Sequence, residues 1–186
     1  LYYEPDTDLH EVGVGRYVAD IRNDDGIIEI QTRRFASLAK KLDAFLPEGP
    51  VTVVYPLAAK KWIAMLDPET GTLGEKRKSP KKETPLDALW ELSFILPHLG
   101  DANLTVRLPM LEVLEFRRRG GRRWKNSTTR LERLSLDLLD EAVLRTKDDY
   151  RALLPPGLPS VFTAADFKAA AKRSNHFTQN ALKTLC

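Results

Sequence analysis

Three residues of this sequence, Asp20, Glu29 and Gln31, combine types and spacing that suit the chemistry of a metal ion. They fall on two predicted strands, residues 11–22 and 27–32, which are separated by a turn signal. Because directly opposed residues of a hairpin share a face, both carboxylates and the amide lie on one face. Carboxylates at close range repel each other unless a cation lies between them, and Mg²⁺ is typically bound by one or two carboxylates together with a substrate phosphate.

The sequence leaves the register of this hairpin open. A loop of residues 24–25 places Asp20 opposite Glu29, whereas a loop of residues 25–26, which suits a type I′ turn better, places Asp20 opposite Gln31. The other face carries residues that we expect to pack on the core: Tyr17, Ala19, Ile21, Ile28 and Ile30.

A second interpretation of the acidic face needs no metal. Arg16 and Arg22 lie on the same face of the predicted hairpin as Asp20 and Glu29. In this interpretation the two guanidinium groups neutralise the two carboxylates in a solvated ladder, and the acids have no role in chemistry.

The order of these residues resembles the PD-(D/E)XK nuclease superfamily, whose fold is restriction-endonuclease-like. That family has an acid, a variable gap and (D/E)-X-K on the next strand, then a helix and further strands; here Asp20 precedes Glu29-Ile30-Gln31. The resemblance covers about residues 10–116. It implies that Asp20, Glu29 and the backbone carbonyl of Ile30 hold Mg²⁺ or Mn²⁺, and that the metal activates a water molecule against a phosphodiester.

Gln31 departs from the family pattern, because a lysine is commoner at this position and the glutamine amide is neutral. Branches of the family with Glu-X-Gln resemble this chain, so Gln31 stays a catalytic candidate. Glu11 is a further candidate, since the family often has one more acid upstream. Its odd position puts Glu11 off the Asp20 face unless Gly13 or Gly15 marks a bulge.

The remainder of residues 1–116 predicts a mixed sheet flanked by helices. Apolar residues recur with helical spacing over residues 35–46, and Pro47 ends that helix. The continuous apolar run of residues 51–55 is typical of a strand buried on both faces. Further predicted elements are a strand at 62–66, a helix at 85–98 and a strand at 104–116, in which Pro109 implies an edge or a bulge.

A basic linker, residues 117–130, separates this domain from a predicted all-helical domain, residues 131–186. Apolar residues recur in one stripe, namely Leu131, Leu134, Leu138, Leu139 and Val143, and three threonines mark helix starts, namely Thr146, Thr163 and Thr178. The tail resembles a winged-helix domain that ends before its wing. A helical packing or dimerisation module is the alternative.

Basic residues with an interleaved tryptophan are typical of nucleic-acid binding. We assign this role to Lys76, Arg77, Lys78, Arg117, Arg118, Arg119, Arg122, Arg123, Trp124, Lys125, Gln179, Asn180 and Lys183. The first three begin a basic stretch at residues 76–82, and the last three would enter a DNA groove from the final helix. In the alternative interpretation these charges form a solvated surface.

Composition excludes several classes of protein. The 186 residues are 42% hydrophobic and 30% charged, which is typical of a globular chain. No apolar run approaches the roughly 18 residues that span a bilayer. Cys186 is the only cysteine, so a disulfide framework and a cysteine-based zinc site are excluded. The net charge changes from −4 over residues 1–59 to +6 over residues 60–133, which suits a metal site beside a polyanion-binding surface.

These observations predict a metal-dependent DNA nuclease or DNA-processing protein that hydrolyses phosphodiesters. The alternative is a non-catalytic nucleic-acid-binding or regulatory protein that reuses the nuclease fold. We expect a cytoplasmic location, DNA as the partner and no membrane partner, with a homodimer left open. The chain begins at Leu1 and ends within a predicted helix, so we expect a fragment of a longer protein or a processed one.

Overall fold

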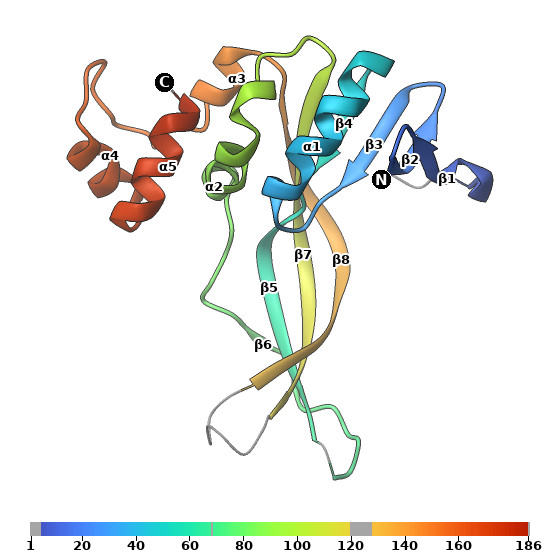
Figure 1. The fold of residues 1–186 in the computed structure, drawn as a ribbon. Helices are drawn as coiled ribbons and strands as arrows, with labels where there is room; N and C mark the ends of the chain where they lie inside the picture. The colour runs from blue at the N-terminus through green and yellow to red at the C-terminus, as the bar shows by residue number, and fades with distance from the viewer. Residues whose placement is uncertain (1–4, 68, 120–127, 186) are drawn as a thin grey trace. The chain divides into compact units, whose positions relative to one another are not determined.

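A computed structural model describes residues 5–67, 69–119 and 128–185 of the chain (Figure 1). The strands are β1 (His10–Val14), β2 (Tyr17–Asn23), β3 (Gly26–Ile30), β4 (Val51–Val54), β5 (Leu57–Leu66), β6 (Arg77–Lys78), β7 (Leu104–Arg119) and β8 (Thr128–Leu144). The α-helices are α1 (Phe35–Phe45), α2 (Leu89–Leu92), α3 (Lys147–Arg151), α4 (Ala164–Ala171) and α5 (Asn175–Leu185), with 3-10 turns at Thr7–Leu9, Leu46–Glu48, Pro85–Ala88 and Ser93–His98. The predicted mixed α/β class is confirmed, and within the described ranges no helix is long and apolar enough to cross a membrane.

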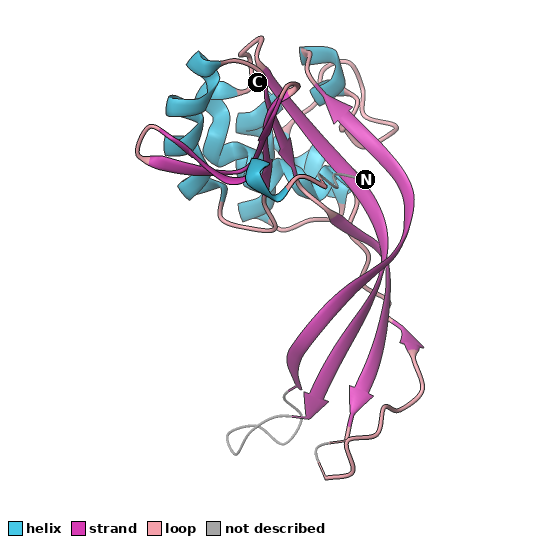
Figure 2. Cartoon of the chain, turned by 90° about the vertical axis from the view of Figure 1, so that its right-hand side faces the viewer, coloured by secondary structure: helices cyan, strands magenta, loops and turns pink. Residues whose placement is uncertain are grey.

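The chain forms two compact units. Unit 1 contains Leu1–Pro56, Pro85–Leu108 and Ala142–Cys186, and unit 2 contains Leu57–Thr84 and Pro109–Glu141. The two long strands β7 and β8 contribute to both units (Figure 2). Each unit therefore has its own set of packed residues.

Unit 1 is a mixed sheet with helices. Strands β1, β2 and β3 form an antiparallel meander, and β3, β4 and the first part of β7 pair in parallel. Helix α1 is the crossover between the parallel strands β3 and β4, as a parallel pair requires. The predicted helix at residues 35–46 is thus confirmed, and its apolar stripe is buried: Phe35, Leu38, Leu42 and Phe45.

Unit 2 consists of strands β5 and β6, the last part of β7 and most of β8, in the order β8-β7-β5-β6. Two prolines, Pro56 and Pro109, lie at boundaries between the two units. β7 pairs with β4 through Arg107 and with β5 from Met110 onward, so Pro109 falls where no ladder bond to either strand is required of its nitrogen. Pro56 lies between β4 and β5. The predicted edge at Pro109 is wrong, because β7 has neighbours on both sides, and the bulge lies in β5 instead.

The all-helical domain predicted over residues 131–186 is wrong in its first part. Residues 128–144 form strand β8, which pairs with β7, and the five residues of the expected helical stripe are exposed. Leu134, Leu136 and Leu138 alternate with polar residues, a period of two that is typical of a strand. The two ends of the expected linker are strand as well, because residues 117–119 belong to β7 and 128–130 to β8; residues 120–127 lie outside the described ranges.

The rest of the tail is helical and belongs to unit 1. Thr146 and Thr163 form capping boxes with Asp149 and Asp166 at the starts of α3 and α4, as their spacing predicts. Thr178 is not a cap, because it is buried inside α5, where the hydroxyl of Ser174 accepts a hydrogen bond from the first turn.

Gly26 allows the β2–β3 hairpin, which carries the candidates Asp20 and Glu29, to lie close to the start of β4. It has a φ of 113°, and a Cβ at this position would clash with the carbonyl oxygen of Pro50. The next residue, Ile27, donates its N–H to the same carbonyl oxygen at 2.9 Å. A side chain at position 26 would therefore separate β3 from β4.

We expect the substitution Gly26→Ala to destabilise the protein by about 1–3 kcal/mol or more. The alanine would be strained by the positive φ, and its Cβ would clash with the main chain of Pro50. Chemical denaturation measures this change. Gly100→Ala is the control, since its Cβ meets nothing within 4 Å, and it should change the free energy of unfolding by less than about 0.5 kcal/mol. Equal stability of the two variants would contradict the close approach.

Candidate active site

The β2–β3 hairpin turns at Asp24 and Asp25. Asn23 pairs with Gly26 and Ile21 with Ile28, so Asp20 stands opposite Glu29. The side chain of Asn23 accepts a hydrogen bond from the N–H of Asp25 at 3.1 Å, which is the local contact of an Asx turn. The alternative loop at residues 25–26 is therefore wrong, because Gly26 is already part of the ladder.

The two carboxylates bind backbone groups across the hairpin. The N–H of Asp20 donates to Oε1 of Glu29 at 3.2 Å, and the N–H of Ile30 donates to Oδ2 of Asp20 at 2.7 Å. Each acid thus satisfies a main-chain donor of the opposite strand beyond the last regular pair, Ile21 with Ile28. The two side chains that the sequence singled out are consequently held side by side on strands.

Glu29 is completely buried and is bonded by a lysine. The ammonium of Lys41 lies 2.9 Å from Oε1 and 2.8 Å from Oε2 of Glu29, and the Lys41 side chain keeps 24% exposure. The solvated arginine ladder is therefore wrong. Arg22 lies 3.5 Å from Glu48 instead, and the guanidinium of Arg16 lies over the ring of Tyr17.

The burial of the hairpin also differs from the prediction. Ala19 and Ile21 of β2 are buried as expected, but in β3 the buried residues are Ile27 and Glu29, on the acidic face. Ile28 and Ile30 are only half-buried and exposed, respectively. Helix α1, which carries Lys41, contacts Glu29 on that acidic face.

Burial raises the pKa of Glu29 above its ordinary value of 4.5, and the negative charge of Asp20 acts in the same direction. The hydrogen bonds and the charge of Lys41 oppose this rise, as does the N–H of Asp20. The carboxylate therefore depends on its cationic and backbone partners to stay charged in a site without solvent.

Lys41 is the site residue that the sequence analysis missed. It lies three residues after Leu38 and four before Phe45, so it follows the same row of α1 that is buried against the sheet. A lysine at the edge of an apolar stripe is the signal that could have identified it. Tertiary contact fixes the helix start, because the N–H of Phe35 donates to Oε2 of Glu91 at 3.0 Å.

Gln31 and Ile30 complete the cluster. The amide nitrogen of Gln31 lies 3.3 Å from Oε2 of Glu29, and the N–H of Gln31 donates to the carbonyl of Val54 in β4. The N–H of Ile30 points to Asp20, and in a strand the carbonyl of the same residue leaves on the same edge. The backbone carbonyl of Ile30 is thus directed to the Asp20 side, as the family resemblance implies.

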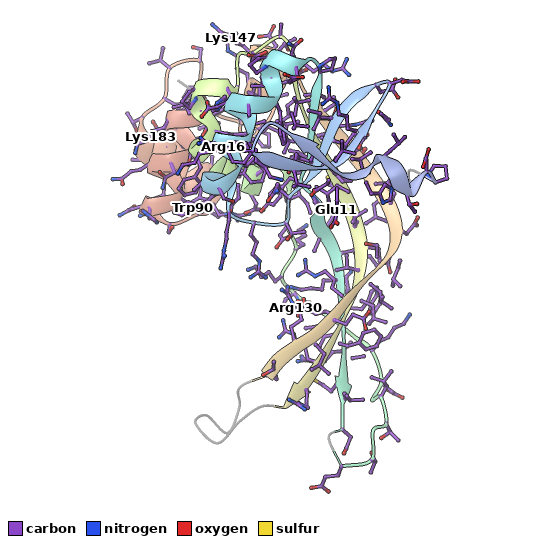
Figure 3. All side chains as sticks on the ribbon, turned by 45° about the vertical axis from the view of Figure 1, so that its right-hand side comes forward. Glu11, Arg16, Trp90, Arg130, Lys147 and Lys183 are labelled. Atoms are coloured by element: carbon purple, nitrogen blue, oxygen red, sulfur yellow. The ribbon has the colours of Figure 1, made fainter. Side chains whose placement is uncertain are left out.

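Glu11 does not join the cluster. His10 pairs with Ile21 and Val12 with Ala19, so the register sets Glu11 opposite Asp20, contrary to the expectation that it lies off this face. Its φ of 52° interrupts β1 at this residue, and its side chain is exposed (Figure 3).

The donors of the cluster fit a magnesium ion in part. Within the described ranges no three His, Cys, Asp or Glu side chains come together as a metal-binding group. Two carboxylates, here Asp20 and Glu29, are nevertheless enough for Mg²⁺ when waters and a substrate phosphate complete its coordination shell. Of the two Asp20 oxygens, only Oδ2 accepts a hydrogen bond from the described residues, whereas both Glu29 oxygens contact Lys41.

The predicted nucleic-acid-binding residues are distributed over both units. In unit 2, Lys76 lies over the ring of Trp62, Arg77 and Lys78 are exposed on β6, and Arg117 forms an ion pair with Glu115. Arg118 is exposed near the end of β7. Nothing is described for Arg122, Arg123, Trp124, Lys125 or the side chain of Arg119. In unit 1, Gln179 is exposed and Asn180 is half-buried on α5. Lys183, labelled in Figure 3, is exposed on the same helix.

Comparison with known proteins finds a family but no described activity. Residues 1–145 match the family model of a domain of unknown function, DUF8091. A protein of Treponema pallidum described as uncharacterised is 29% identical over 168 residues, which are 89% of this chain and 66% of the relative. The chain therefore spans about two thirds of that relative's length. No solved structure matches the chain.

We expect Lys41→Met to destabilise the protein by about 3 kcal/mol at neutral pH, because it leaves the Glu29 carboxylate buried without its cation. The pKa of Glu29 should rise further in this variant. Its folded state then keeps a proton that the unfolded chain releases near 4.5, so stability is present at acidic pH and falls as pH rises through the raised pKa. Denaturation at a series of pH values measures both effects.

Two further variants make this measurement specific. The exposed neighbour Lys40, changed to Met, should alter stability by less than about 0.5 kcal/mol. Adding Glu29→Gln to Lys41→Met removes the unpaired charge and should recover stability at neutral pH. If Lys41→Met were as stable as Lys40→Met at every pH, the buried ion pair would not hold the site.

Proposed function

The chain belongs to the DUF8091 family, and we propose that it is a metal-dependent nuclease that hydrolyses the phosphodiester bonds of DNA. The observation that carries this proposal is the convergence of Asp20, Glu29, Gln31 and Lys41 at one end of the β2–β3 hairpin. Two acids, an amide and an ammonium group on rigid elements are a set of groups that suits phosphodiester hydrolysis.

The order of elements supports the restriction-endonuclease-like fold within this proposal. One acid lies on β2, the Glu-X-Gln segment lies on β3, and α1 then crosses to β4, which is parallel to β3. This is the sequence of acid, turn, (D/E)-X-K strand, helix and further strand that the PD-(D/E)XK resemblance requires. The helix pair α4 and α5, with Gln179 and Lys183 exposed, is the part of the expected winged helix that we retain as a DNA contact.

In this proposal Asp20, Glu29 and the carbonyl of Ile30 would hold Mg²⁺ or Mn²⁺. A metal held there would activate a water molecule for hydrolysis. Hydrolysis joins the water oxygen to phosphorus and breaks one P–O ester bond, and the leaving oxygen takes up a proton. Asp20 is already oriented for this role by the N–H of Ile30, so little rearrangement of its side chain is needed.

Lys41 accounts for the glutamine at position 31. An amide cannot provide the positive charge that a lysine provides in the family motif. The ammonium of Lys41 reaches the same carboxylate that Gln31 contacts, from α1 instead of β3. We propose that this charge stabilises negative charge that develops on the phosphoryl oxygens, while the Gln31 amide orients the Glu29 carboxylate.

A second candidate function is a non-catalytic nucleic-acid-binding or regulatory protein with the same fold. The observation that favours it is the contact of Lys41 with both oxygens of Glu29, which neutralises the carboxylate without a metal. In this case the cluster is an internal ion pair of the fold, and the acids bind no ion.

The two functions separate on Asp20→Asn. For the nuclease, this variant should keep its fold, lose Mn²⁺ binding in calorimetric titration, and lose metal-dependent cleavage of plasmid and single-stranded DNA by more than about 100-fold. Asp24→Asn, an exposed acid in the turn of the same hairpin, should keep both. Gln31→Lys should remain active, because lysine is the commoner residue in the family motif.

Binding of Mn²⁺ and cleavage of DNA, measured together, identify which function is present. Wild-type protein that binds no Mn²⁺, or that binds it as tightly as Asp20→Asn does, would exclude the metal site and leave the non-catalytic function. Binding of Mn²⁺ without cleavage of any DNA form would exclude the nuclease function but would support the metal site.

A further inference from the structure

Unit 2 contains a hollow of about 610 Å³ beside strand β5. Its lining residues are Ala59, Lys60, Lys61, Lys78, Ser79, Pro80 and Lys82. Two hydrogen bonds fix the segment that closes one side: Ser79 donates its N–H to the carbonyl of Lys61 at 2.8 Å, and Glu83 donates its N–H to that of Ala58 at 3.0 Å. Residues 80–82 lie between these two attachments, opposite the bulge of β5, so backbone contacts form the hollow.

All titratable side chains that line the hollow are lysines. Lys78 and Lys82 are exposed, and Lys60 forms an ion pair with Glu112 at 2.7 Å. No Asp or Glu lines the hollow. The lining therefore carries an excess of positive charge, which attracts an anion.

Lys61 is the least exposed of the four lysines, at 7%. The described residues provide no hydrogen bond or ion pair for its ammonium. Two acids act on it through their charge, Glu115 and Glu83. Both have other partners: Glu115 is bonded to Arg117 and Arg133, and Glu83 accepts the N–H of Ala58.

The environment of Lys61 disfavours its charge. Burial lowers the pKa of Lys61, and the charges of Arg133 and Arg117 act in the same direction, against Glu115 and Glu83. The Lys61 nitrogen itself is not enclosed, so it can reach an anion in the hollow. A bound anion at the hollow would supply the missing partner.

We propose that this hollow is a binding site for phosphate groups. Lysines bind phosphate as compact point charges with three donors each, and several of them match the charge of two or more phosphates better than that of a single carboxylate. Ser79 adds a hydroxyl donor, because its oxygen already accepts the N–H of Lys81 at 3.3 Å and its hydrogen is left for a ligand. Ala59 and Pro80 are the uncharged part of the lining.

The phosphates can come from a nucleic-acid backbone or from a free polyphosphate, and both present the same group to the lysines. If they belong to DNA, the hollow is a second contact to the substrate of the proposed nuclease, and that reading rests on the proposed function. Binding measured in EDTA keeps the two questions apart, because metal-dependent cleavage is then absent whether or not the proposed function is correct.

The first experiment compares two double variants of equal charge. Lys78→Gln with Lys82→Gln changes the hollow, and Lys40→Gln with Lys147→Gln changes exposed lysines on α1 and α3 (Figure 3 labels Lys147). Fluorescence anisotropy with a labelled duplex in EDTA should show at least about a tenfold loss of affinity at low salt for the hollow variant, and a salt slope smaller by about 2. The control variant should match the wild-type protein.

Inorganic pyrophosphate tests the other source. A rise in the Tm of the wild-type protein that is absent from the hollow variant shows that the site takes a free polyphosphate. A loss of duplex affinity without any response to pyrophosphate assigns the site to the nucleic-acid backbone. Both results support a phosphate site.

Lys61→Met separates a ligand-binding lysine from a structural one. Without ligand, the variant should be more stable, with a Tm higher by about 2–4 °C, because it removes a charge that its partly buried environment disfavours. Its affinity for the duplex or pyrophosphate should fall at least about tenfold. Lower stability with unchanged affinity, or equal behaviour of the hollow and control variants toward both probes, would overturn the proposal.

Discussion

The buried ion pair between Glu29 and Lys41 is the interaction on which the candidate site depends. A carboxylate without solvent exposure needs bonded donors, and Glu29 obtains them from three elements: the backbone of β2, Gln31 at the end of β3, and Lys41 on α1. These bonds set the distance between the hairpin and the helix. The helix start is held in turn by Glu91, so a segment distant in the sequence contributes to the position of Lys41.

A buried ion pair often contributes little to the stability of a helix packed on a sheet. Apolar residues of similar volume often stabilise a protein as much or more, because they need no desolvation of charge. The neighbours of Lys41 on α1 already provide such packing through Leu38, Leu42 and Phe45. The proposed nuclease would give the charges at Glu29 and Lys41 a chemical role that packing alone does not require.

Unit 2 presents the complementary case, a buried lysine without a bonded acid. Lys61 is also less exposed than Lys41, and it has no bonded acid among the described residues. The two proposals accordingly give the lysines different tasks: Lys41 would act beside Glu29, and Lys61 would bind an anion from outside. Pro56 and Pro109 lie where the chain passes between the two units, so each site is built on its own set of strands.

Sequence by itself determined the local elements and the residues of the hairpin. Alternation, the turn signal and the apolar stripe of α1 placed Asp20, Glu29 and Gln31 on two adjacent strands before a helix, and capping boxes marked α3 and α4. These features depend on interactions within a few residues, so the pattern of residue types is enough to predict them.

Tertiary structure alone decided what the acids contact and how the later chain folds. The register followed from the pairing of Gly26, the partner of Glu29 came from α1, and residues 128–144 became a strand because β7 offered a backbone edge for pairing. Helical spacing and alternation both occur in that segment, and only a partner strand chooses between them. The reason is physical: burial, ion pairing and strand pairing join residues that are distant in sequence, and their free energy exceeds local preference.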